Sequence, residues 1–120
     1  MSDRPAINVK LSHTDKPLAV FTHTCLRPIL KQKHNTLCAI IRDDKNFDVE
    51  VISKFSEAKN TVFLKEFMQK NTALRSILTG VIVGRFSEDE LAFYLENQKE
   101  IRRRIVEMTI TRFLSEFDLV

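Results

Sequence analysis

The stretch LCAIIRDDKNFDVEVI, Leu37–Ile52, is the segment on which the expected fold depends. Its first part, Leu37–Arg42, is a mostly apolar run, and its second part, Phe47–Ile52, alternates apolar with acidic or small polar side chains. Such alternation is typical of a strand that keeps one face in water. The residues between the two parts, 43–46 (DDKN), are types that favour tight turns. The stretch therefore predicts a β-hairpin over residues 37–52.

A further strand is expected near the N-terminus, because apolar and polar side chains alternate over Ala6–Leu11. The segment Pro17–Lys33 has mixed signals, with apolar residues at helical spacing but also a run of β-branched and aromatic types. Pro28 disfavours a helix interior because it lacks a backbone N–H. We expect a short helix or strand here, followed by a turn at Pro28.

The C-terminal half has helical periodicity. A helix is predicted from about Glu57 to Thr79, either unbroken or pausing at Asn71-Thr72, with Gly80 as its C-terminal cap. The sequence FSEDEL that begins at Phe86 predicts a capping box, in which the side chains of Ser87 and Glu90 exchange hydrogen bonds with the backbone. A long helix is expected to follow.

Together these patterns predict a single α+β domain over residues 1–120. Its small antiparallel sheet, built from the N-terminal strand and the hairpin, is expected to be packed by two or three C-terminal helices. The length of 120 residues, with 43% hydrophobic and 29% charged residues, suits one globular core. The nine phenylalanines fit such a core better than a polar recognition surface.

Composition excludes several classes of protein. The chain holds two glycines, too few for a loop whose backbone amides cradle phosphate groups. It has no apolar run long enough to span a membrane and no apolar segment near the N-terminus that would act as a secretory signal. Two cysteines without an export signal indicate free thiols in a reducing compartment. We therefore expect a cytoplasmic protein with no membrane partner.

The charge distribution suggests a surface for nucleic acid. The net charge is +3 overall, but residues 1–35 carry +4 and residues 87–120 carry −3. Basic side chains attract the phosphate backbone by releasing counterions. The leading hypothesis is a small non-enzymatic regulatory protein that binds nucleic acid, or a nucleic-acid-associated machine, through a basic face. The side chains expected to contact phosphates are Lys31, Lys33, Arg102, Arg103 and Arg104.

The last helix carries apolar residues on two faces, which one packing surface would not satisfy. Either the helix kinks, or its end folds back on the same core, or its end contacts a partner. The third explanation makes the chain a homodimer, or an adaptor or inhibitor that acts on another protein. The residues expected in that interface are Ile110, Phe113, Leu114 and Phe117.

A group of histidines and cysteines offers the remaining alternative. Thiolate and imidazole groups are the donors that zinc prefers, so four of them would form a structural site without an open position. Their spacing matches no standard zinc finger, and a cysteine in an apolar segment is commonly a small core residue. The weak candidates for such a site are His23, Cys25, His34 and Cys38. A zinc- or thiol-dependent enzyme built on His23 and Cys25 is the weakest hypothesis, and the expectation is no catalytic residue and no cofactor.

Overall fold

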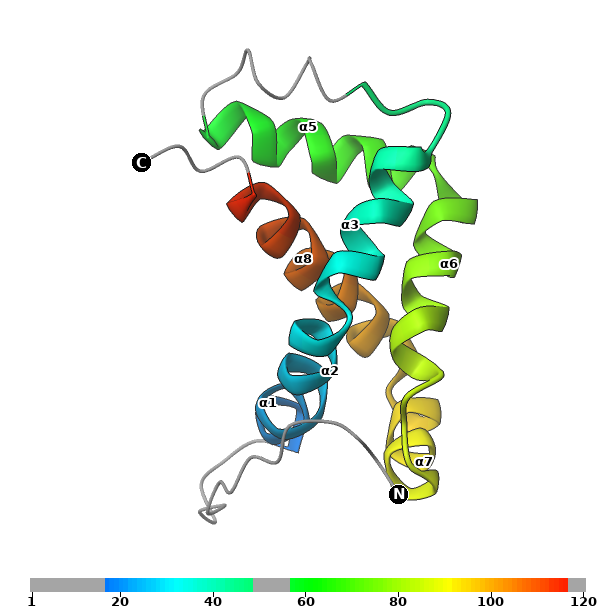
Figure 1. The fold of residues 1–120 in the computed structure, drawn as a ribbon. Coiled ribbons are helices and arrows are strands. Elements are labelled where there is room, and N and C mark those ends of the chain that lie inside the picture. Colours follow the sequence, from blue (N-terminus) through cyan, green and yellow to red (C-terminus); the bar gives the residue numbers. More distant parts are fainter. Residues whose placement is uncertain (1–16, 49–56, 117–120) are drawn as a thin grey trace.

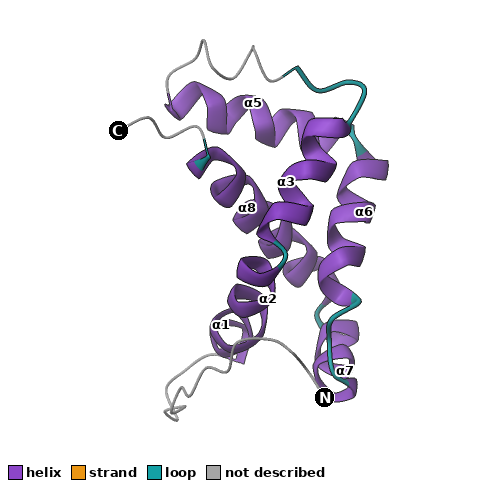
Figure 2. Cartoon of the chain, viewed as in Figure 1, coloured by secondary structure: helices purple, strands orange, loops and turns teal. Residues whose placement is uncertain are grey.

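The structure, a computed structural model, describes residues 17–48 and 57–116. Every regular element in these two ranges is a helix, as Figure 2 shows. No helix of either range has the length and the apolar character needed to cross a lipid bilayer. In chain order the elements are α1 (Pro17–Phe21), the π-helix η1 (Thr22–Leu26), α2 (Arg27–Gln32), α3 (His34–Asp43), α5 (Glu57–Lys70), α6 (Thr72–Val83), α7 (Glu88–Glu96) and α8 (Gln98–Ser115).

The prediction of an α+β fold with an antiparallel sheet is wrong. The first expected strand of the hairpin, Leu37–Arg42, lies inside helix α3. Residues three and four positions apart share one face of a helix, and the buried residues of α3 have that spacing. A short apolar run fits a buried helix as well as a strand, so periodicity alone did not distinguish them. The buried residues of α3 are Leu37, Cys38 and Ile41.

The second expected strand of the hairpin begins with Phe47 and Asp48, which lie in the loop after α3. Its other residues, and the expected strand Ala6–Leu11, lie outside the described residues. The turn chemistry between the two expected strands is confirmed, although the turn ends a helix. The Asp44 carboxylate accepts a hydrogen bond from the backbone N–H of Asn46 at 2.9 Å, which is the local bond that favours Asp in turns.

The turn expected at Pro28 does not form, because the helix is wider just before the proline. The backbone N–H of Arg27 donates to the carbonyl of Thr22, five residues back, which is the π-helical pattern. In a regular α-helix the proline ring clashes with the carbonyl four residues earlier. The wider turn gives the ring room, so α1, η1 and α2 follow one another without a break.

Local hydrogen bonds set the remaining boundaries. Asn71 separates α5 from α6, and its side chain caps α6 by accepting from the backbone N–H of Leu74 at 3.1 Å. The predicted capping box is confirmed, because Ser87 accepts from the backbone N–H of Glu90 and donates its own N–H to the Glu90 carboxylate. The prediction that Gly80 caps a helix is wrong, since α6 continues through it to Val83.

Helix α8 runs diagonally through the middle of the bundle and contacts α3, α5, α6 and α7 (Figure 1). This central place explains its two apolar faces. Successive residues turn by about 100° on a helix, so the buried positions of α8 cover roughly half its circumference as one wide arc. Thr109 lies in the middle of the arc, and its hydroxyl donates to the carbonyl of Ile105 at 2.7 Å. The buried residues of α8 are Ile101, Ile105, Thr109, Ile110 and Phe113.

Candidate binding cleft

A cleft of about 1010 Å³ lies between α5, α6, α7 and α8. Its volume is at the upper end of the roughly 300–1,000 Å³ of ordinary ligand pockets. Much of its lining is apolar, and two leucines one turn apart on α7 are open to solvent, Leu91 at 39% exposed and Leu95 at 55%. The apolar lining residues are Met68, Val83, Leu91, Leu95, Val106 and Ile110.

Basic side chains surround this apolar lining. Lys65 comes from α5, and Lys99 and Arg102 come from the first turns of α8; all three are exposed. Arg102 Nε donates a hydrogen bond to the Tyr94 hydroxyl at 2.7 Å. Arg75 also lines the cleft, but its guanidinium donates to two backbone carbonyls at the end of α5, at 2.9 and 2.8 Å. Arg75 thus holds the α5–α6 junction, while the other three cations face solvent.

Besides Arg75 and Val83, the α6 wall of the cleft is made of small side chains. Its surface leaves open space at Gly80, where an added Cβ would meet no heavy atom within 4 Å. A wall of this kind lets another backbone approach closely. The small α6 residues that line the cleft are Thr72, Ser76, Thr79 and Gly80.

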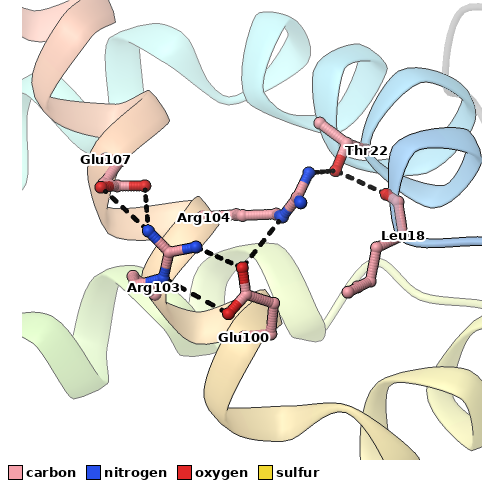
Figure 3. Close-up of polar contacts among 6 residues, drawn as sticks. All are labelled: Leu18, Thr22, Glu100, Arg103, Arg104 and Glu107. Carbon is pink, nitrogen blue, oxygen red and sulfur yellow. Dashed lines mark hydrogen bonds and ion pairs between the residues drawn. The ribbon is translucent and has the colours of Figure 1, made fainter. Parts of the chain in front are cut away.

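The three consecutive arginines of α8 diverge, as Figure 3 shows for two of them. Arg103 lines the cleft but pairs with Glu100 and Glu107, so its charge is largely offset. The hydrogen bond from Arg103 holds the pKa of the Glu100 carboxyl below its usual value. Arg104 points toward η1, where it donates to the Thr22 hydroxyl at 3.0 Å. The expected phosphate-binding arginines therefore do not share one direction.

The other two residues expected to contact phosphates do not line the cleft. Lys31 is exposed on α2, and Lys33 is half-buried between α2 and α3. The cleft instead uses Lys65 and Lys99, which sequence reasoning missed. They lie 34 residues apart in sequence and only the packing of α5 against α8 places them at one cleft.

The residues expected to form a partner interface are mostly part of the chain's own core. Ile110 is 2% exposed and Phe113 is fully buried, with its ring 5.5 Å from that of Phe47. Leu114 is partly buried against the same core, and Phe117 lies outside the described residues. The end of α8 is thus folded onto the core, which is one of the alternatives that its two apolar faces left open.

The structure brings together two of the four expected zinc ligands and adds an acid. His34 and Cys38 lie one turn apart on α3, and Glu116 approaches them from the end of α8. His23 is exposed on η1 and Cys25 is buried there, and neither belongs to this cluster. Burial raises the pKa of the Cys38 thiol, and the negative charge of Glu116 raises it further. A higher pKa lowers the fraction of the thiolate, which is the nucleophilic form of cysteine.

Comparison of the chain with protein-family models, with curated proteins and with solved structures gives no match in any of the three.

Proposed function

We propose that this chain is a non-enzymatic binding protein whose cleft receives an acidic, amphipathic α-helix of a partner protein. The observation that carries the proposal is the combination, in one cleft, of exposed leucines on α7 with exposed cations on α5 and α8. This combination favours the adaptor or inhibitor hypothesis over the nucleic-acid hypothesis. The proposed contact surface is the cleft, whereas the sequence analysis indicated the end of α8.

The shape of the partner follows from hydrogen bonding. The walls of the cleft are helices, whose backbone groups bond within each helix, so they offer no strand edge to an extended peptide. A segment that enters an apolar cleft must therefore satisfy its own backbone N–H and C=O groups, since unsatisfied buried groups are costly. An α-helix does this, and the small side chains around Gly80 leave it room to approach.

The charge of the partner follows from the rim. Within the described ranges, the side chains of Lys65 and Lys99 form no ion pair with a carboxylate. Acidic residues beside the apolar stripe of a bound helix would reach these cations and Arg102. Such rim charges act mainly on association rate and specificity, while the apolar contacts supply most of the affinity.

The function is tested by selection from a display library of randomised helical peptides. Peptides of about 15 residues are used, because shorter isolated helices hold together poorly. We expect the selected sequences to place apolar residues at i, i+3, i+4 and i+7 and acids beside them. Fluorescence polarisation then measures their affinity for the full chain and for its variants.

The decisive variant is Gly80→Leu, at an exposed position that lines the cleft and has open space for a Cβ. We expect it to abolish peptide binding while the protein stays folded. Leu95→Asn should weaken binding, whereas Ile77→Asn, at a similarly exposed apolar residue outside the cleft, should not. Lys65→Glu should weaken binding and Lys70→Glu, on the same helix but away from the cleft, should not.

Two results would overturn the proposal. The first is selection of peptides without an apolar stripe, or with basic flanks. The second is binding that Gly80→Leu leaves unchanged. Tight binding of short duplex DNA or single-stranded RNA, falling steeply with salt and lost in Lys31→Glu, would instead support the nucleic-acid hypothesis.

A further inference from the structure

Three different metal-binding atoms meet where the end of α8 crosses the start of α3. One imidazole nitrogen of His34, the Sγ atom of Cys38 and one carboxylate oxygen of Glu116 all lie within 4.8 Å of one another. His34 and Glu116 are 82 residues apart in sequence, so tertiary packing alone brings them together.

Two of the three separations, both measured from His34 Nε2, match those around tetrahedral zinc. Zn–N and Zn–O bonds of about 2.1 Å and a Zn–S bond of about 2.3 Å place neighbouring N and O atoms about 3.4 Å apart, and N and S atoms about 3.6 Å apart. The observed distances are 3.2 Å from His34 Nε2 to Glu116 Oε1 and 3.7 Å from His34 Nε2 to Cys38 Sγ. Both lie within a few tenths of an ångström of the tetrahedral edges.

We infer that His34, Cys38 and Glu116 form a zinc site with water as the fourth ligand. The side chains of His34 and Glu116 are 20% and 37% exposed, so a metal ion and a water molecule reach the site from solvent. Cys38 lies beneath them and is 4% exposed. The bound ion would join the start of α3 to the end of α8 and so stabilise the central helix of the bundle.

Metal binding at His34 requires a change in the hydrogen bond that Arg112 donates to this histidine. Arg112 Nε donates to His34 Nδ1 at 3.2 Å, and because a guanidinium only donates, the proton of a neutral imidazole sits on Nε2. Zinc takes the Nε2 lone pair, so that proton moves to Nδ1 and Arg112 must turn away. The Cys38 thiol loses its proton to solvent, and Glu116 binds as the carboxylate. One proton is released for each ion bound. The two positive charges of zinc are then balanced by the Cys38 thiolate and the Glu116 carboxylate.

The test uses the full chain with Co²⁺ as a spectroscopic probe and Zn²⁺ in competition with a coloured chelator. We expect one Co²⁺ per chain, with a sulfur-to-cobalt charge-transfer band and the intense visible bands of tetrahedral cobalt, displaced by Zn²⁺. Release of one proton makes affinity rise about tenfold for each pH unit while the thiol is protonated. Zinc should also raise the unfolding temperature, because it binds the folded state.

Matched variants assign the ligands. Cys38→Ala should remove the charge-transfer band, and Cys25→Ala, at the other buried cysteine, should keep it. His34→Gln and Glu116→Gln should each weaken Zn²⁺ binding, and His23→Gln should not.

The inference fails if the unmodified chain gives no charge-transfer band with Co²⁺. It also fails if Cys25→Ala removes the band while Cys38→Ala keeps it. Circular dichroism of each variant separates loss of a ligand from loss of the fold.

Discussion

Arg102 Nε lies 2.7 Å from the hydroxyl oxygen of Tyr94, and this hydrogen bond joins α8 to α7 at the wall of the cleft. Tyr94 is 5% exposed and its ring packs edge-on against Phe86, with centroids 5.7 Å apart. A buried aromatic ring therefore positions an exposed cation. This contact links two helices that line the cleft and orients the Arg102 side chain beside it.

Replacing Tyr94 with Phe separates these two effects. The ring and its packing stay, while the hydrogen bond is lost. We expect the free energy of unfolding in urea to fall by about 1 kcal/mol, the net value of a typical hydrogen bond. Affinity for the selected acidic peptides should fall as well, because Arg102 is no longer oriented. If the variant has unchanged stability and unchanged peptide affinity, the contact contributes to neither.

Gly80→Ala should stabilise the protein. Gly80 lies inside α6 with space for a Cβ, and alanine is favoured over glycine in a helix interior by about 1 kcal/mol. Urea unfolding should show a gain of that size. Gly84→Ala is the control, because its Cβ would lie 3.1 Å from the carbonyl oxygen of Gly80, so its gain should be smaller or negative. Equal gains at both positions would contradict this account.

The pKa of Glu100 reports the ion pairs of α8. The hydrogen bond from Arg103 is the main cause of its lowered pKa, and the charge of Arg104 adds to it. A lowered carboxyl pKa stabilises the fold at pH values above the unfolded pKa, and that contribution is lost as the pH falls through the folded pKa. Arg103→Gln should move the Glu100 pKa, measured by NMR, back up toward its ordinary value. A pKa that does not rise would show that Arg103 is not its cause.

Phe113→Ala tests whether the end of α8 belongs to the core of the chain. Its ring is fully buried, so truncation should cost about 3–5 kcal/mol of unfolding free energy. Leu114→Ala, at a partly buried neighbour, should cost less. The loss should not depend on protein concentration if the contacts lie within one chain. A loss that grows on dilution would instead place Phe113 in an interface between copies.

Several features of the fold were predictable because their causes are local. The capping box at Ser87 and Glu90 needs only residues three positions apart. The sequence predicted either an unbroken helix over about Glu57–Thr79 or a pause at Asn71-Thr72. The helix is interrupted there because the Asn71 side chain caps the helix that follows it. The turn at Asp44 likewise depends on a side chain and a backbone N–H two residues away.

Other features depended on contacts that no local pattern contains. Leu37–Arg42 suits a strand or a helix, and burial of one α3 face against α6 and α8 accompanies the helix. The two apolar faces of α8 became one arc only because four helices surround it. Glu116 was not a candidate ligand until packing placed it beside His34.

The order of residues in this chain was thus enough to mark the helix starts at Asn71 and Ser87 and the turn at Asp44, since those depend on hydrogen bonds between near neighbours. Its fold class, its cleft and its His34–Cys38–Glu116 cluster depended on which surfaces meet in space. That choice is set by burial of apolar area between helices far apart in sequence, and such burial has no signature at short range.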